Sequence, residues 1–520
     1  MTLARAMDAA VAAIVVGAAL AVAGCRVIAA VLTGGERSLR AAIAAETASG
    51  LIAARRRVSL AAAMRGRLRQ YVTLRALVHR AVRARDAARA MQAIAGNTLG
   101  AAVQAGRLAL SRRRRKAASG SGEIVMLVVS DLRIDPRVER EARALAMAGF
   151  PVKVVFPDIS LPRIADQPLN WGAGVTFRPL PLETSAYVMD CPWLFGNRLF
   201  RAACQERPLA FHCHDLTTTL IGLAAARRVG VRCVCDFHEW FSENVSWNSR
   251  TMQWRPHHPA RRRYYRTIER LALLKADGVV TVCDSIAREL EWMGRHRTKV
   301  RVVRNIPELG AVPTRSYAPI KQELGIAAER FLLLYQGGTG PTRLLEPVIE
   351  ALAWVPDVIF VIRGPSLDLF GGAYRALAEK CGVGDRLILL PPVPSRDVVA
   401  AARGADAGLY TVNNLCKNFY YALPNKIFEY MAAGVPILTA DFPEAAGLVA
   451  AHDIGLCFDP YDPASIAAQI RRLVAEPELA AAMRRRIPQA LSTISAGREW
   501  HKLVELYDRF GNKSAVSKAA

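Results

Sequence analysis

Short apolar runs alternate with helix-forming stretches after Gly122, and this alternation limits the fold more than any other feature of the chain. Residues 123–130 read EIVMLVVS, a helical stretch at 138–148 follows and ends at Gly149, and residues 152–156 form the next apolar run. Nearly continuous β-branched runs are typical of strands buried on both faces of a parallel sheet. The pattern therefore predicts an α/β fold built from parallel βα units.

The apolar runs fall into two series, which predicts two doubly wound Rossmann-like domains facing a cleft. The expected strands are residues 123–130, 152–156, 209–213, 232–236, 278–282 and 300–303, followed by 331–335, 358–362, 386–390, 407–410 and 436–439. Residues 313–326 contain prolines and no long apolar run, so we place an N-terminal Rossmann-like domain at 123–315 and a C-terminal one at 316–490. Residues 491–520 would form a C-terminal crossing helix and a tail. Ligands of such sheets bind beyond the carboxyl ends of the strands.

Positive charge is concentrated in front of these domains. Residues 1–120 contain 21 Lys and Arg against four acidic residues, so they carry +17 of the net charge of +25. Residues 36–122 are rich in Ala, Arg and Leu, a composition that favours helix, and they end in a basic and Gly/Ser-containing linker. We expect a basic helical extension lying on an anionic membrane surface. A solvated helical hairpin or a partly disordered tail remains an alternative, and nucleic acid is disfavoured because Tyr71 is the segment's single aromatic residue.

Residues 1–35 contain an apolar stretch at 9–32 that is interrupted only by Arg26. Its length is close to the ~20 residues needed to cross a bilayer, so residues 1–35 are expected to be a transmembrane or membrane-anchoring segment. Basic residues follow the stretch, which places the rest of the chain at the cytoplasmic face of the inner membrane, or in the cytoplasm with peripheral membrane association. A secretory signal, or a lipoprotein cleavage box at 22–25, are the alternatives.

Three polar motifs follow strands of the first domain, and they supply the predicted catalytic residues. Asp135 precedes a helix that starts with Pro136, His214 emerges where strand 209–213 stops, and Glu239 follows strand 232–236. A neutral ring nitrogen can contact a ligand hydroxyl, and carboxylates beside aromatic rings suit a hydroxylated acceptor. Helix capping explains Asp135 equally well. We therefore predict His214, Glu239 and Asp135 as catalytic residues.

A glycine turn in the second domain is a candidate phosphate loop. Gly337 and Gly338 follow strand 331–335, and Arg343 comes shortly after them. Glycines allow the backbone to approach an anion, and a guanidinium binds diphosphate oxygens. We predict that these three residues contact the phosphates of a bound nucleotide.

The most specific motif is the segment 422–436, which reads ALPNKIFEYMAAGVP. Pro424 begins a helix, and glycine and proline end it before the next strand. The amino end of that helix, with Asn425 and Lys426, suits phosphate oxygens. Glu429 lies one turn further and can accept hydrogen bonds from ribose hydroxyls. We predict Asn425, Lys426 and Glu429 as ligands of the same nucleotide.

Ten cysteines are scattered along the chain without the spacing of a metal site. Cys233 and Cys235 share one face of a strand, and we expect reduced, buried thiols of a cytosolic domain. His212 and His214 also share a face, but the sequence supplies no third ligand beside them. We predict no metal site.

Together these residues resemble the family 4 (group 1) retaining glycosyltransferases of GT-B fold, in particular the branch with a PNK-FEY-AAG signature. The resemblance runs from about residue 125 to about residue 510, and it is carried by 135–141, His214 and Asp215, 236–239, 282–285, 305–307 and 424–436. It implies that Glu429 binds the donor ribose, that Arg343 contacts the diphosphate and that His214 faces the donor sugar. It also implies retention of configuration, no metal, and a nucleotide-sugar donor.

Two positions depart from the pattern of that family. Tyr421 stands where many relatives carry a second glutamate, and Gly338 stands where an arginine is usual. These departures leave an inactive, membrane-tethered binding protein as an alternative, and a sugar-nucleotide epimerase is another. The expected acceptor is a saccharide or a lipid-linked glycan, as in polysaccharide or glycoconjugate biosynthesis.

Overall fold

A computed structural model of the protein describes residues 122–159, 163–180, 192–248, 253–307, 309–310 and 312–510. The expected membrane segment at 9–32 and the basic extension at 36–121 lie outside these residues. Among the helices that are described, none combines the length and the apolar character needed to span a bilayer.

The first lobe is built on a seven-stranded parallel sheet in the order β3-β2-β1-β4-β5-β8-β9. Its strands are β1 (Ile124–Leu127), β2 (Val152–Pro157), β3 (Val175–Leu180), β4 (Ala210–His214), β5 (Arg232–Phe237), β8 (Gly278–Thr281) and β9 (Val300–Val302). Its helices are α4 (Pro136–Met147), α6 (Pro192–Ala203), α7 (Asp215–Val229), α8 (Pro259–Lys275) and α9 (Asp284–Met293). A separate antiparallel hairpin joins β6 (Val245–Asn248) to β7 (Gln253–Pro256). The predicted doubly wound sheet is confirmed for this lobe.

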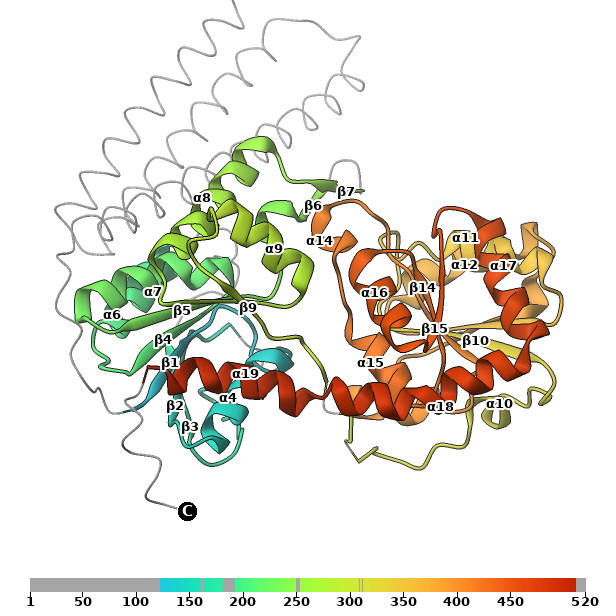
Figure 1. The fold of residues 1–520 in the computed structure, drawn as a ribbon, viewed down its shortest axis with the longest axis horizontal. Helices are drawn as coiled ribbons and strands as arrows, with labels where there is room; N and C mark the ends of the chain where they lie inside the picture. Colours follow the sequence, from blue (N-terminus) through green and yellow to red (C-terminus); the bar gives the residue numbers. More distant parts are fainter. Residues whose placement is uncertain are drawn as a thin grey trace, which may run out of the picture. The chain divides into compact units, whose positions relative to one another are not determined.

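The second lobe contains a six-stranded parallel sheet in the order β12-β11-β10-β13-β14-β15. Its strands are β10 (Phe331–Gln336), β11 (Val358–Arg363), β12 (Leu387–Leu390), β13 (Ala407–Tyr410), β14 (Ile437–Ala440) and β15 (Gly455–Phe458). Its helices are α10 (Ile320–Glu323), α11 (Glu346–Ala351), α12 (Leu367–Lys380), α13 (Val398–Ala402), α14 (Lys417–Tyr420), α15 (Asn425–Ala432), α16 (Pro443–His452), α17 (Pro463–Ala475) and α18 (Pro477–Thr493). Helices α11, α12 and α17 gather together (Figure 1), whereas α15 and α16 both contact α18. Helices therefore cover both faces of the sheet.

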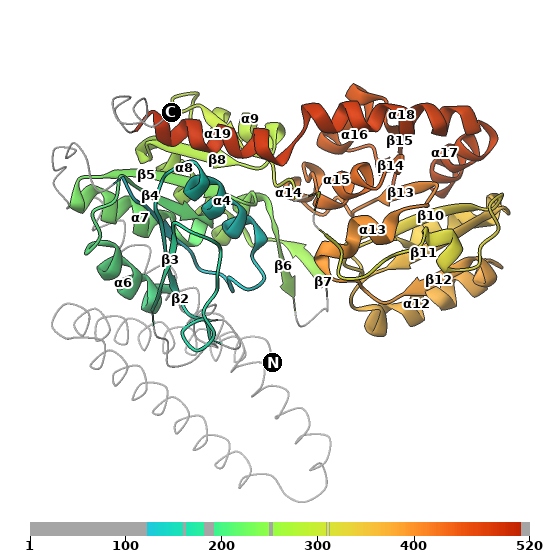
Figure 2. The same ribbon diagram turned by 90° about the horizontal axis from the view of Figure 1, so that it is seen from below.

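The last helix, α19 (Ala496–Asp508), packs on the first lobe although it follows the second in sequence. It lies beside α4 (Figure 2) and contributes Trp500, Leu503 and Tyr507 to the apolar cluster that covers one face of the first sheet. Gly278 in β8 permits this contact, because a Cβ atom there would lie 3.1 Å from Leu506. The end of the chain thus completes the core of the lobe in which the described structure starts.

Candidate active site

Helix α15 in the second lobe is held by a buried tyrosine. The Tyr430 hydroxyl accepts a hydrogen bond from the Gln336 amide at 2.8 Å and can donate to the carbonyl of Leu334 at 3.2 Å. Gly408 in β13 leaves room for the ring, because a Cβ atom there would lie 2.3 Å from Cγ of Tyr430. Phe428 and Met431 are buried, as the sequence indicated. The opposite side of α15, with Lys426 and Glu429, stays partly exposed.

The side chain of Lys426 lies beside the glycine turn that follows β10. Its Nζ lies 3.9 Å from the centroid of the Tyr335 ring, a cation–π contact, and it would lie 3.0 Å from a Cβ atom placed on Gly337. Gly337 also has a φ of 138°, which side chains rarely tolerate. The Arg343 guanidinium would lie 4.0 Å from a Cβ atom on Gly338. The structure therefore gathers both predicted glycines, the lysine and the arginine around one turn.

The electrostatics of this cluster favour an anionic ligand. Burial and the neighbouring Arg343 lower the pKa of Lys426 to about 7, although Glu429 acts in the opposite direction. Burial also raises the pKa of Glu429, against the influence of Lys426 and of Arg140. Asn425 begins α15, and its N-cap residue Pro424 offers no side-chain hydrogen bond to the first turn. The two cations can stabilise phosphate oxygens, whereas the Glu429 carboxylate suits hydroxyl groups.

In the first lobe, polar side chains converge at the carboxyl ends of β4 and β5. Arg137 of α4 lies 2.9 Å from carboxylate oxygens of both Glu141 and Asp236, and all three side chains are buried. His212 lies 3.3 Å from Glu141 through Nε2, and its Nδ1 is 2.6 Å from the Tyr507 hydroxyl. This network joins helices α4 and α19 to strands β4 and β5.

His214 and His238 touch at the edge of this network. Nδ1 of His214 lies 3.0 Å from Nε2 of His238, and Nε2 of His238 lies 3.2 Å from Asp236. The side chain of His214 is only 2% exposed. Burial and the neighbours His212 and His238 hold the pKa of His214 well below its usual value, so its ring is neutral at physiological pH.

The other two predicted catalytic residues have more local roles in this structure. Asp135 is the N-cap of α4, where it accepts hydrogen bonds from the Val138 amide and, at 2.6 Å, from the Ser130 hydroxyl. Glu239 is exposed and accepts a hydrogen bond from the Asn244 amide group. Asp135 therefore shows the capping arrangement that the sequence also suggested, and a catalytic role for either residue stays a prediction.

Tyr421, which replaces a glutamate of many family members, contacts residues of the first lobe. Its ring stacks on Trp240 with 6.2 Å between centroids, and its hydroxyl donates to Glu289 at 3.1 Å. Tyr421 also borders a cavity of about 470 Å³ together with Glu289 and Trp292. Tyr421 therefore joins the first lobe through an aromatic contact and a hydrogen bond.

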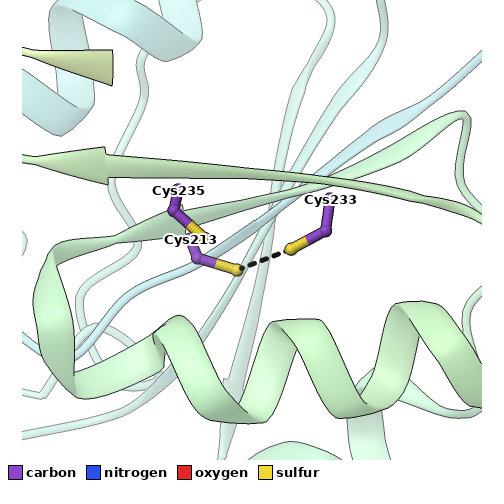
Figure 3. Close-up of side chains that lie close together, drawn as sticks. All are labelled: Cys213, Cys233 and Cys235. Carbon is purple, nitrogen blue, oxygen red and sulfur yellow. Dashed lines mark hydrogen bonds between the residues drawn. The ribbon is translucent and has the colours of Figure 1, made fainter. Parts of the chain in front are cut away.

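Two groups of side chains in the described structure have donor atoms close enough to hold a metal ion. One is formed by Glu141, His212, His214 and Asp236, but both of its carboxylates already pair with the Arg137 guanidinium. The other is formed by three buried thiols of β4 and β5 (Figure 3), Cys213, Cys233 and Cys235.

The sulfur atoms of Cys213 and Cys233 lie 3.6 Å apart, and helix α7 passes beside them. Gly222 of α7 makes room, because a Cβ atom there would lie 1.9 Å from Sγ of Cys213. All three cysteines are free and buried, as predicted for Cys233 and Cys235. The expectation that no metal binds stays a prediction.

Comparison with known proteins assigns both lobes. The model of a glycosyl transferase 4-like domain matches residues 134–305, and that of the glycosyl transferases group 1 matches residues 317–490. The chain is a group 1 glycosyltransferase. The D-inositol 3-phosphate glycosyltransferase of Nocardiopsis dassonvillei is 26% identical to it over 337 residues, which are 61% of this chain and 74% of the relative. The protein of that name from Acidothermus cellulolyticus is 26% identical over 295 residues, 54% of this chain and 63% of the relative.

Solved structures show that this glycosyltransferase has the predicted GT-B fold. It superposes on sucrose-phosphate synthase from Thermosynechococcus elongatus with a TM-score of 0.58 at 16% identity, covering 74% of this chain and 98% of that one. It superposes equally well on Anabaena HepE in complex with UDP, with a TM-score of 0.58 at 14% identity, covering 74% and 100%. Two parallel-sheet domains are therefore confirmed.

Sequence reasoning missed several groups that shape the sites of the glycosyltransferase. Tyr335 was read as a strand residue, yet its ring supports Lys426. Glu141 was noted only as part of segment 135–141, although its spacing of four residues from Arg137 on a helix is that of an ion pair. Tyr507 lies near the end of the chain, and no local pattern could have indicated its contact with His212.

Proposed function

We propose that the second lobe of the glycosyltransferase binds a nucleotide-sugar donor, with the diphosphate at the turn of Gly337 and Gly338. The observation that carries the proposal is the position of the Lys426 ammonium, beside Gly337 and close to Arg343. Glycines at this turn allow phosphate oxygens to approach the backbone, and the two cations neutralise them. Structural neighbours of the chain support this ligand class, because Anabaena HepE is described in complexes with UDP and with UDP-glucose.

Glu429 is proposed to accept hydrogen bonds from the ribose hydroxyls, with Asn425 one turn before it. Glu429 is partly exposed on α15, and it lies about one turn from Lys426, the cation proposed to bind phosphate. Both features support this role. A carboxylate repels phosphate, so it is better suited to the pentose. The segment from Pro424 to Pro436 would then be the PNK-FEY-AAG signature of one branch of family 4.

The reaction is proposed to be transfer of the sugar with retention of configuration. Negative charge develops on the departing diphosphate, and Arg343, Lys426 and the amides of the α15 amino end would stabilise it without a metal ion. The acceptor hydroxyl would attack on the face that the leaving phosphate vacates, and that phosphate would take the hydroxyl proton. His214 would contact the donor sugar, and Glu239 and Asp135 are proposed to act on the acceptor side.

The decisive experiment measures nucleotide release from UDP, GDP and ADP sugars by the wild type and by Glu429→Ala, with saccharide and lipid-linked acceptors. We expect release with one nucleotide class and a loss of about 10- to 100-fold in Glu429→Ala, since a hydrogen bond to a charged group contributes about 1.5–3 kcal/mol. Glu478→Ala is the matched control, because Glu478 is an exposed residue of α18. Equal rates for both variants would rule out the ribose contact.

We further propose that residues 1–120 hold the enzyme at the cytoplasmic face of the inner membrane, where a lipid-linked acceptor would be available for polysaccharide or glycoconjugate assembly. The charge of +17 in this segment supports attraction to anionic lipids. Fractionation of a version that lacks residues 1–117 tests this. Unchanged membrane association of the shortened chain would rule out the proposed role of the segment.

A further inference from the structure

His238 is held from both ends of its ring. Its Nδ1 lies 3.5 Å from a carboxylate oxygen of Asp215, and its Nε2 lies 3.2 Å from Asp236 and 3.0 Å from Nδ1 of His214. Its backbone amide donates to Asp215 at 3.2 Å. Asp215 has a φ of 61°, a left-handed conformation that few residues other than glycine adopt, although aspartate is among them. The strand-to-helix junction thus orients the carboxylate that holds His238.

The charged neighbours of His238 determine its protonation. Burial lowers the pKa of His238, but Asp215 and Asp236 together raise it to about 9, against the opposing charge of Arg137. The charge of Glu239, the next residue in sequence, also interacts with the charge of His238. His238 therefore carries a proton on both ring nitrogens at neutral pH, and Nε2 is a donor.

This protonation leaves one arrangement for His214. A proton on Nδ1 of His214 would point at the Nε2 proton of His238 across 3.0 Å, so Nδ1 must be the acceptor. Because His214 is neutral, its single proton resides on Nε2. That Nε2 atom is buried and has no hydrogen-bond partner among the described residues. The structure therefore contains an oriented, unused donor at the carboxyl end of β4.

We propose that His238 is a positioning residue that fixes His214 as its Nε2–H tautomer, so that His214 donates a hydrogen bond to an oxygen of the bound donor sugar. The sugar contact rests on the proposed function. The tautomer does not, because the contacts that determine it lie entirely within the first lobe. With Nδ1 protonated instead, His214 would present a lone pair at the same place and could only accept.

The tautomer can be measured without substrate. The full chain is labelled with ¹⁵N-histidine, and long-range ¹H–¹⁵N correlation spectra report the protonation of each ring near neutral pH. The signals of His214 and His238 are assigned with His214→Asn and His238→Gln variants. We expect His214 to be neutral with its proton on Nε2 and His238 to be doubly protonated. A proton on Nδ1 of His214, or a charged His214, would overturn the proposal.

Two substitutions separate positioning from a structural role. His238→Gln keeps an N–H that can reach His214, whereas His238→Leu removes it, and His257→Gln is a control because His257 contacts Ser246 outside the site. We expect His238→Leu to lower kcat about 100-fold with a donor KM within about threefold of wild type, as for loss of one oriented donor. His238→Gln should retain most of the activity. Wild-type kcat for His238→Leu would overturn the proposal.

The pH profile gives a third readout. As pH rises through about 9, His238 loses a proton, and the neutral ring shares its one remaining proton between the Asp215 side at Nδ1 and the Asp236 side at Nε2. In the molecules whose Nε2 of His238 is unprotonated, that nitrogen becomes an acceptor, and His214 can carry its own proton on Nδ1. We expect kcat to fall over this range in the wild type and not in His238→Gln. If His238→Leu does not fold, the wild-type spectra still determine the tautomer of His214. If no donor is turned over, the proposed function fails, but the tautomer measurement remains valid.

Discussion

The Lys426 ammonium lies over the ring of Tyr335, 3.9 Å from its centroid, instead of extending into water. The aromatic face holds the cation beside the glycine turn, while burial and Arg343 lower the pKa of the amine to about 7. Lys426 is therefore poised between its charged and neutral forms in the free enzyme. A bound diphosphate would favour the charged form.

Donor affinity should consequently depend on pH. Lys426 is protonated below about pH 7 and neutral above it, so binding of a nucleotide sugar should weaken as pH rises through that value. Calorimetric titration with the preferred donor between pH 6 and 8.5 measures this. Lys426→Met should bind more weakly at pH 6 and show little pH dependence. Equal pH dependence in both proteins would show that another group is responsible.

Gly408 should be intolerant of even a methyl group. A Cβ atom at this position would lie 2.3 Å from Tyr430, whose hydroxyl is fixed by backbone hydrogen bonds, so the ring has no direction in which to move. We expect Gly408→Ala to lower the free energy of unfolding by about 1–3 kcal/mol, as for an overpacked core. Gly447→Ala in α16 meets nothing within 4 Å and should stabilise by up to about 1 kcal/mol. Urea denaturation of both variants tests the pair, and similar shifts would contradict the packing argument.

Arg137 should be essential for the stability of the first lobe. Its removal would leave the buried carboxylates of Glu141 and Asp236 with neighbouring histidines as their only cationic partners among the described residues. We expect Arg137→Leu to destabilise by about 3–5 kcal/mol, as for other broken buried ion pairs. Arg143→Leu affects the half-exposed pair with Glu139, and it should change stability by less than about 1 kcal/mol. Thermal or urea unfolding distinguishes them, and a mild effect of Arg137→Leu would show that the neighbouring histidines compensate the two carboxylates.

The contribution of His212 to stability should be lost at alkaline pH. Burial lowers the pKa of His212, but Asp236 and Glu141 raise it to about 9, above the value of 6.5 for a free histidine. The stabilisation is thus fully present below pH 6.5 and disappears as pH rises through about 9. The difference in unfolding free energy between the wild type and His212→Asn should therefore be largest below about pH 6.5 and should shrink as pH rises through about 9. Other titrating groups are common to both proteins, so a constant difference would contradict this reasoning.

The two-lobed fold was predictable because most of its strands are nearly continuous apolar runs. Two strands of the parallel sheets were nevertheless missed, β3 (Val175–Leu180) and β15 (Gly455–Phe458), as were the hairpin strands β6 and β7. Each of the first two lies at the edge of its sheet and has mostly half-buried side chains, and β3 also contains Arg178 and Pro179. Edge strands need less apolar surface, so their sequences resemble loops.

The candidate site could be predicted only in part. The carboxyl ends of strands indicated His214, and the helix amino end indicated Lys426, because both positions follow from local sequence. The contact between His214 and His238, and that between Lys426 and Tyr335, join residues that are distant in sequence. Such pairings depend on how strands align in the sheet, which no local pattern specifies.

The hydrogen bond between Tyr507 and His212 has a consequence for biosynthesis. While a ribosome is still translating the second lobe, the first lobe already has its seven strands. It still lacks α19, the helix that covers β8 and supplies the Tyr507 hydroxyl to His212. Final packing of the lobe must then wait until the last segment emerges, so chains released prematurely would expose an unfinished interior to proteases and chaperones.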